Sequence, residues 1–107
     1  MTKLAIPKNT TVEIMGHTWE VVYEEYSEED MRTFGETDHY LRTITIYLRP
    51  HRDYPARGPL AQTLLHECMH AALNSSGVTH SISKEEEAVV TALEHALWPL
   101  VNTGVFE

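Results

Sequence analysis

The feature that most constrains this chain is a His-Glu-x-x-His pattern inside a run of helix-forming residues that extends from Leu64 to Leu73. In a helix, His66 and His70 lie one turn apart on the same face and can share one metal ion. Glu67 lies about 100° round the helix from His66, where it can reach a water on that ion without being a ligand. Two neutral imidazoles and a nearby carboxylate are the set that a zinc hydrolase needs. The pattern therefore predicts a metal-binding helix with a candidate general base.

A motif this short also arises by chance. The competing interpretation is a surface helix on which His66 and His70 face solvent and Glu67 forms a helical ion pair. The setting favours the metal site, because the motif lies within a helix-forming run and candidate third ligands follow it. Cys68 lies about 200° round the helix from His66 and so faces away from the metal. We expect it in the core, on the buried side of the helix, together with Leu64, Leu65, Ala71 and Ala72.

Length, cysteine content and charge restrict the class of protein. A chain of 107 residues is predicted to form a single domain with one modest core. The single cysteine excludes an internal disulfide, and we find neither an apolar run long enough to span a bilayer nor a signal-peptide pattern. These features favour a cytoplasmic location, in a bacterium or a phage-infected host cell. The formal net charge of −8 repels phosphate backbones, so we expect no direct nucleic-acid binding and no membrane contact.

Two stretches of alternating apolar and polar residues, Thr10–Met15 and Thr18–Tyr23, predict a β-hairpin with its turn at Gly16–His17. The most regular alternation is in Arg42–Leu48, where every second residue from Ile44 onward is a large aliphatic one. These patterns predict three strands.

The segment between the hairpin and the third strand, Glu24–Asp38, is acidic. We expect a short helical turn at Ser27–Arg32 and a break in the chain at Gly35. A loosely ordered lead-in, residues 1–9, precedes the strands. Residues 10–49 are therefore expected to be mainly β, as a small antiparallel sheet of two to four strands.

Two long helices are predicted in the second half of the chain. The first spans residues 58–74, starts at Gly58-Pro59 and ends before Gly77. The second spans residues 82–101, and Pro99 is expected to kink or terminate it. It carries an apolar stripe that is typical of a buried face: Val89, Val90, Leu93, Leu97 and Leu100. Strands followed by helices predict an α+β fold.

A catalytic zinc usually has three protein ligands and a water in the fourth position. The longer pattern His-Glu-x-x-His-x-x-Gly-x-x-His is excluded, because Leu73 and Ser76 stand where it requires glycine and histidine. The candidates that remain for the third ligand are His80 in the linker and, at the start of the second helix, Glu85, Glu86 and Glu87.

The sequence leaves the choice between Glu86 and Glu87 open. Glu86 follows Ser83 by three residues, a capping-box spacing that turns its side chain toward the start of the helix. Glu87 lies on the flank of the apolar stripe, where a ligand at the rim of the core is expected, and we prefer it. Glu86 nevertheless aligns more directly with the stripe and can point at the metal if Ser81 is the cap. Glu85 faces further round, toward solvent.

The other histidines and the tyrosines are weaker candidates. The four histidines without ligand spacing are expected to be surface or half-buried groups: His17, His39, His51 and His95. A tyrosine near the metal could donate a hydrogen bond to a developing oxyanion. The tyrosines in question are Tyr40, Tyr47 and Tyr54, and Tyr47 is equally well explained as an exposed aromatic on a sheet.

Two segments, Gln62–Ala71 and Glu85–Leu93, resemble small phage- and prophage-encoded zinc metallopeptidases similar to the ImmA/IrrE-like group. The hairpin around Ile14-Met15-Gly16 and the strand that follows also fit the layout of that family. In the family, two histidines and a downstream glutamate bind zinc, and the motif glutamate is the general base.

The resemblance implies the zinc-binding role for His66 and His70, the general-base role for Glu67, and the third-ligand role for Glu87 or Glu86. Alignment on the proline near the end of the second helix favours Glu86, whereas alignment on its leucines favours Glu87. The Ala-Asn pair and the Leu-Leu-Met-Pro ending of larger members are absent here. The sequence also has no helix-turn-helix segment, so a repressor-linked role would require a separate regulatory protein partner.

The leading hypothesis is a zinc-dependent metallopeptidase with a minimal zincin-like fold that acts on a protein or peptide substrate. Zn²⁺ would be held by His66, His70 and preferably Glu87, and Glu67 would accept the proton of the metal-bound water. The strand Arg42–Leu48, if it borders the cleft, could pair with an extended substrate. The alternatives are a non-catalytic zinc-stabilised interaction module and an interaction protein whose motif is accidental. The sequence identifies neither the substrate nor the oligomeric state.

Overall fold

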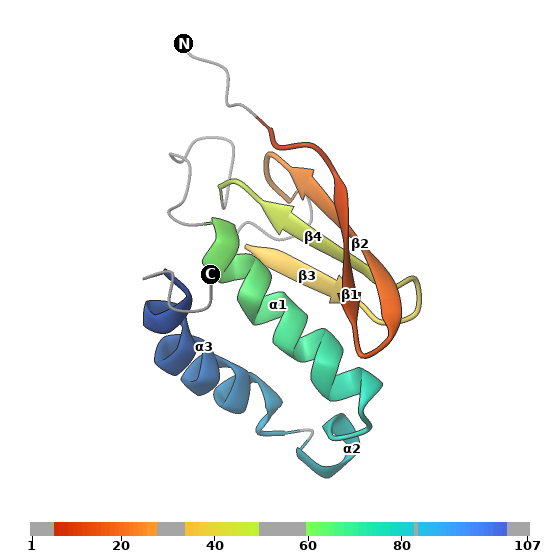
Figure 1. Ribbon diagram of the computed structural model, residues 1–107, viewed down its shortest axis with the longest axis vertical. Helices are drawn as coiled ribbons and strands as arrows, with labels where there is room; N and C mark the ends of the chain where they lie inside the picture. Colours follow the sequence, from red (N-terminus) through yellow and green to blue (C-terminus); the bar gives the residue numbers. More distant parts are fainter. Residues whose placement is uncertain (1–5, 28–33, 50–59, 83, 103–107) are drawn as a thin grey trace.

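The computed structural model describes residues 6–27, 34–49, 60–82 and 84–102 (Figure 1). In this part of the chain the fold is α+β, as predicted: a four-stranded sheet is followed by helices. The elements are β1 (Thr10–Ile14), β2 (His17–Glu24), β3 (Gly35–Asp38), β4 (Thr43–Tyr47), α1 (Leu60–Ser75), α2 (Thr79–Ile82) and α3 (Glu86–Asn102). The predicted turn at Ser27–Arg32 beyond its first residue, the Gly58-Pro59 helix start and the Ser83 cap lie outside the described residues.

The predicted hairpin is confirmed, with a different turn. β1 and β2 are antiparallel and remain paired as far as Ile14 opposite His17. The two turn residues are therefore Met15 and Gly16, whose φ angles are 52° and 80°. A two-residue hairpin turn with both φ angles positive has the twist that suits the flanking strands. His17 is thus the first residue of β2 and not part of the turn.

The sheet is mixed, which corrects the expectation of an antiparallel sheet. The strand order is β1-β2-β4-β3, with β2 and β4 parallel and β3 and β4 antiparallel. β3 was not predicted, because Gly35-Glu36-Thr37-Asp38 lacks the apolar residues that mark a strand. Gly35 begins this strand instead of breaking the chain. β4 confirms the predicted strand at residues 42–48. It lies inside the sheet, whose two edge strands are β1 and β3.

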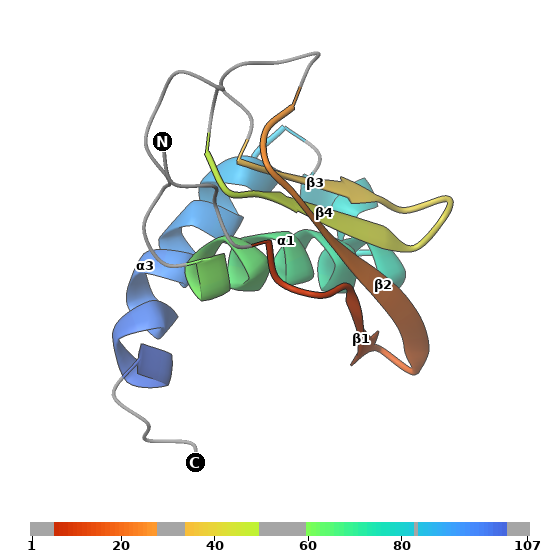
Figure 2. The same cartoon turned by 90° about the horizontal axis from the view of Figure 1, so that it is seen from above.

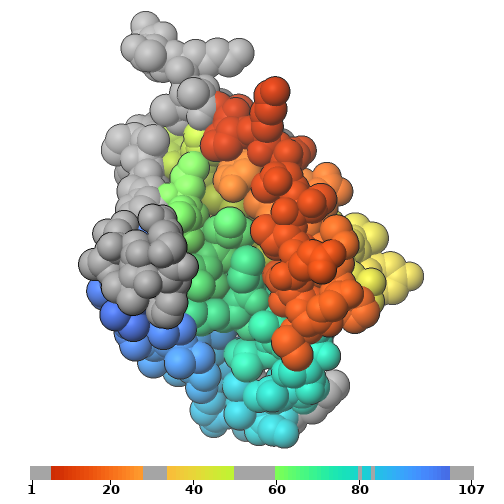
Figure 3. Space-filling view, in the orientation of Figure 1, coloured from red at the N-terminus to blue at the C-terminus, as the bar shows by residue number. Residues whose placement is uncertain are grey.

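The core lies between one face of the sheet and α1 (Figure 2). The helices lie on this side of the sheet, and Figure 3 shows α1 between the β1–β2 hairpin and α3. The side chains that are buried in this layer are Ile14, Trp19, Val21, Ile44, Ile46 and Ala71. Tyr47 is also buried, but strand alternation directs it to the opposite face of the sheet, away from α1. This position removes it from the candidates for oxyanion stabilisation.

The helices α1 and α2 differ slightly from the sequence prediction. α1 ends one residue later than expected, and Gly77, which follows it, adopts a left-handed conformation with a φ of 83°. Its N–H donates to the Asn74 carbonyl at 3.1 Å, which closes the end of the helix. The segment expected to be a linker contains the short helix α2.

α3 departs most from expectation. It starts at Glu86 and passes through Pro99 to Asn102 without termination. Of the predicted apolar stripe, Val90 alone is fully buried, and the three leucines that follow it are 38–44% exposed. None of the helices in the described part of the chain is long and apolar enough to cross a membrane.

Candidate metal centre

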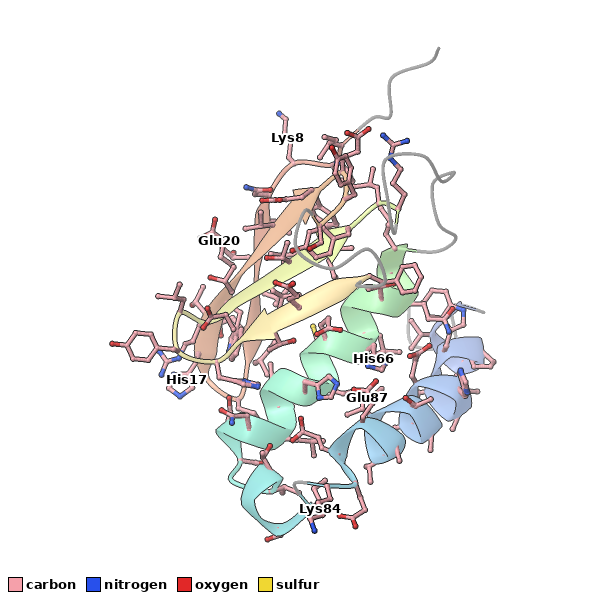
Figure 4. The ribbon with its side chains drawn as sticks, turned by 180° about the vertical axis from the view of Figure 1, so that it is seen from behind. Lys8, His17, Glu20, His66, Lys84 and Glu87 are labelled. Atoms are coloured by element: carbon pink, nitrogen blue, oxygen red, sulfur yellow. The ribbon has the colours of Figure 1, made fainter. Side chains whose placement is uncertain are left out.

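His66 projects from α1 toward Glu87 of α3 (Figure 4), and His70 contacts the same glutamate. Because they lie one helical turn apart, their rings are neighbours, with centroids 5.0 Å apart and planes inclined by 61°. Their side chains are 17% and 13% exposed, so both are largely shielded from solvent. The helix thus presents two imidazoles to one point, as the motif predicted.

Glu87 meets both rings from α3. Its Oε1 lies 2.9 Å from Nε2 of His66, and its Oε2 lies 2.8 Å from Nε2 of His70. One ligand atom from each of the three residues lies within 4.8 Å of the other two, so the group could hold a metal ion. This is the residue that the sequence favoured as third ligand. The side chain of His80 lies outside the described part of the chain.

Two further carboxylates contact the other nitrogen, Nδ1, of the two rings. Glu94 Oε1 lies 2.6 Å from Nδ1 of His66, and Glu86 Oε2 lies 2.6 Å from Nδ1 of His70. An ionised carboxylate only accepts hydrogen bonds, so both Nδ1 atoms carry a proton. Carboxylates bound to Nδ1 in this way are common around metal-bound histidines, where they leave the opposite ring nitrogen, Nε2, to bind the ion.

These two carboxylates are themselves held in place. The Thr79 hydroxyl donates to Glu86 Oε1 at 2.6 Å, and the Gln62 amide donates to Glu94 Oε2. The hydrogen bond from Thr79, joined by the one from His70, lowers the pKa of Glu86 despite its burial. Burial alone would raise the pKa of Glu94, but the hydrogen bonds from His66 and Gln62 outweigh it and lower that pKa.

The pKa of His70 moves in the other direction. Burial alone would lower it, but the hydrogen bond to Glu86 and the negative charges of Glu67 and Glu87 outweigh burial and raise it. Glu86 thus orients His70, whereas its predicted capping contact with Ser83 lies outside the described residues.

Glu67 lies under the edge strand β3, on the side of α1 that faces the sheet. It is only 8% exposed, and its Oε1 accepts a hydrogen bond from the Thr37 hydroxyl at 2.6 Å. A Cβ on Gly35 would lie 3.0 Å from Cγ of Glu67 and 3.0 Å from the Thr63 methyl group. Glycine at position 35 therefore leaves the space in which the carboxylate lies.

The histidines, Glu67 and Glu87 share one cavity of about 1070 Å³ between β3, α1 and α3. This volume is slightly above the usual range for small-molecule sites and leaves room for a segment of polypeptide. The wall also includes His39 and His95, both exposed, which the sequence assigned to the surface without a site. His39 packs edge-on against Trp19, at a centroid distance of 6.0 Å. His17 lies at the far end of the hairpin (Figure 4).

Cys68 contacts the core, as predicted, and is not part of the cavity wall. Burial, together with the negative charge of Glu67, raises the pKa of its thiol to about 11. A thiol with this pKa is protonated at neutral pH and is a poor metal ligand and nucleophile.

Sequence reasoning missed Glu94, Thr37 and Gly35. Glu94 follows Glu87 by seven residues, which places both on one face of a helix, and this spacing could have identified it. No local signal connects Thr37 or Gly35 with Glu67. No protein-family model, curated protein or solved structure matches the chain.

Proposed function

We propose that the protein is a zinc-dependent metallopeptidase with a minimal zincin-like fold, which hydrolyses a peptide bond in a specific protein substrate. The observation that carries the proposal is the convergence of both Nε2 atoms and the Glu87 carboxylate within one cavity that Glu67 also lines. Two histidines and one glutamate form a known ligand set of catalytic zinc, and they leave a fourth position for water. The Nδ1–carboxylate pairs would hold both rings ready to bind the ion.

Zn²⁺, when bound, would polarise the scissile carbonyl and lower the pKa of a water molecule. Glu67 would take the proton of that water and pass it to the leaving amine. The Thr37 hydroxyl donates a hydrogen bond to Oε1 of Glu67. The other oxygen, Oε2, would therefore be the one that accepts the proton of the water. Burial of Glu67 and the close approach of Gly35 restrict the carboxylate to one position, which is what a positioned base requires.

The edge strand β3 would bind the substrate backbone, in place of the strand at residues 42–48 that the sequence suggested. Phe34 O accepts a hydrogen bond from Tyr47 N at 2.9 Å, which makes these residues a hydrogen-bonded pair of the antiparallel ladder. The alternation that follows directs the backbone groups of Glu36 toward β4 and those of Gly35 and Thr37 outward. An extended peptide could add to the sheet through these outward groups, beside the cavity.

The test combines metal content with activity. We expect purified protein to contain about one zinc ion, measured by mass spectrometry of the metal, and to cleave peptides in a chelator-sensitive reaction. Glu67→Gln should retain the zinc and lower peptidase activity by roughly 10²- to 10⁴-fold, because the base is lost while the ligands remain. Glu20→Gln, an exposed carboxylate on β2, is the matched control and should retain full activity. Metal-free protein with two freely mobile histidines by NMR would refute the proposal.

The second candidate is a non-catalytic zinc-stabilised module. It is favoured by the way α3 is attached, since its contacts with α1 are formed largely by carboxylates on His66 and His70. A metal there would fasten two helices of a small domain. The spectrum of Co²⁺-substituted protein separates the two functions: an open, water-occupied position supports the enzyme, and a closed four-ligand site supports the module. Stability that does not change with a chelator would indicate an accidental motif.

A further inference from the structure

The side chains of β3 divide between the two faces of the sheet. Gly35 and Thr37 approach Glu67 and so lie on the face toward α1. Glu36 and Asp38 lie on the opposite face, and both are exposed. Strand alternation places Tyr47 on the same outer face, and the negative charge of Glu36 contributes, after burial, to the raised pKa of Tyr47.

We propose that Glu36 and Asp38 make this edge specific for extended polypeptide segments that carry lysine or arginine at every second position. The inference rests on the proposed function in one respect, which is that a peptide adds to β3. In an antiparallel addition, Gly35 and Thr37 would form the hydrogen-bonded pairs, because their backbone groups point outward. Glu36 and Asp38 would then stand in the pairs without hydrogen bonds, where facing side chains are closest.

Alternation in the added strand determines which of its residues meet these carboxylates. Substrate residues opposite Glu36 and Asp38 would lie on the outer face, two positions apart in the substrate sequence. The residue between them would lie opposite Thr37, on the face that holds Glu67 and the candidate metal ligands. A lysine or arginine at the two outer positions forms a favourable cross-strand charge pair, and an acidic residue there is repelled.

The charge of the cavity wall supports the same preference. Besides Glu36 and Asp38, the described residues that line it include three carboxylates, those of Glu67, Glu87 and Glu94, and no lysine or arginine. A divalent ion would offset two of these charges and leave the wall negative. Asp38 also accepts a hydrogen bond from Leu41 N at 2.9 Å, which holds its carboxylate at the end of the strand. A basic segment would therefore be attracted at long range. Its affinity would then depend on whether its basic residues lie opposite Glu36 and Asp38.

The experiment measures binding, so that it does not depend on turnover. Glu67→Gln protein, supplied with zinc, is titrated into four fluorescein-labelled decapeptides, and anisotropy reports the affinity. Three of them carry lysine, glutamine or glutamate at every second position, and the fourth has the same lysines in one block. We expect the alternating lysine peptide to bind about tenfold more tightly than the glutamine peptide, from two cross-strand charge pairs. It should also bind several-fold more tightly than the blocked lysine peptide, which cannot place all its charges on one face.

Substitutions on the outer face supply the second arm. Glu36→Gln should remove most of the lysine preference, and Glu36→Lys should shift the preference toward the glutamate peptide. Glu20→Lys is the control, because it makes the same change of charge on the same face of the sheet but on β2, which β4 separates from β3. It should preserve the order of affinities among the four peptides. If Glu20→Lys and Glu36→Lys have equal effects, or if both lysine peptides bind equally, the attraction is general and the proposal is overturned.

The outcomes also separate this inference from the proposed function. In one outcome the unsubstituted protein binds the peptides with the expected preference and cleaves none of them. That result would refute the peptidase function and leave the binding specificity of β3 standing. Cleavage without a lysine preference would remove the specificity alone. Absence of binding to all four peptides would overturn the inference.

Discussion

The helices α1 and α3 contribute equally to the candidate site but are held in different ways. α1 packs against the sheet, and Ala71 and Glu67 on its inner side are almost fully removed from solvent. α3 packs mainly against α1, and Val90 is its fully buried apolar residue. Leu97, one of the leucines expected in the core, is 38% exposed. A conventional hydrophobic core therefore positions the histidines, whereas mostly polar contacts position the carboxylates that meet them.

The two helices are therefore stabilised by different kinds of interaction. α1 depends on apolar burial, which changes little with metal or pH. α3 depends on ionised groups and hydrogen bonds, whose strength changes with both. The region that brings Glu86, Glu87 and Glu94 to the site is thus the region most sensitive to what the site binds.

The largest expected effect comes from the core beneath α1. Ile44→Ala should lower the free energy of unfolding by about 2–5 kcal/mol, because Ile44 is fully buried and its removal leaves a cavity. Leu97→Ala on α3 should lower it by less than about 1 kcal/mol. Urea unfolding followed by circular dichroism measures both. Equal losses would show that the exposed face of α3 is covered in solution, and the difference between the helices would no longer hold.

An intermediate effect is expected from the carboxylates behind the histidines. Glu86→Gln and Glu94→Gln should each weaken zinc binding by roughly 10- to 100-fold, because a histidine loses the charged partner that orients its ring. Competition with a chromophoric chelator measures this affinity. Glu85→Gln changes an exposed neighbouring carboxylate and should leave zinc binding unaltered. Unchanged affinity in both test variants would show that these contacts do not prepare the site.

The smallest expected effect is the pH dependence of the metal-free protein. The lowered pKa values of Glu86 and Glu94 add stability above the ordinary carboxyl pKa, which is lost as pH falls through the lowered values. The raised pKa of His70 adds stability below the ordinary histidine pKa, which is lost as pH rises through the raised value. The α1–α3 contact should therefore be strongest between about pH 4.5 and 6.5.

Hydrogen exchange measured across this range should show the change in α3, with little change in α1. A maximum in the unfolding midpoint at mildly acidic pH is expected as well. A midpoint that varies in one direction only from pH 4 to pH 8 would contradict the assignment of stability to these ion pairs.

The parts of the fold that follow from local sequence were predictable. Alternation identified β1, β2 and β4, and helix start and stop signals placed α1 and α3 to within a few residues. β3 escaped prediction because its four residues are polar or glycine, and pairing with β4 alone makes them a strand. The parallel pairing of β2 with β4 likewise depends on long-range contacts that no local pattern records.

The candidate site divides in the same way. The motif and its helical spacing identified His66, His70 and Glu67, and Glu87 was preferred on its position beside the apolar stripe. The stripe itself was misjudged, because periodicity shows that a helix has an apolar side without showing what covers it. Polar residues on the flank of the stripe, including Glu94, face α1 instead.

The place of β4 in the sheet has a consequence for biosynthesis. β4 is the last strand in the described part of the chain, yet it lies between β2 and β3. Until residue 47 has left the ribosome, the nascent chain can form only the β1–β2 ribbon, and a two-stranded ribbon is marginally stable in water. The pairing of β2 with β4 joins positions 23 residues apart, as at Glu20 and Thr43, so it is a slow, non-local step. Assembly of the sheet therefore waits for one five-residue strand, and the edge β3 that borders the candidate site has no partner before that strand arrives.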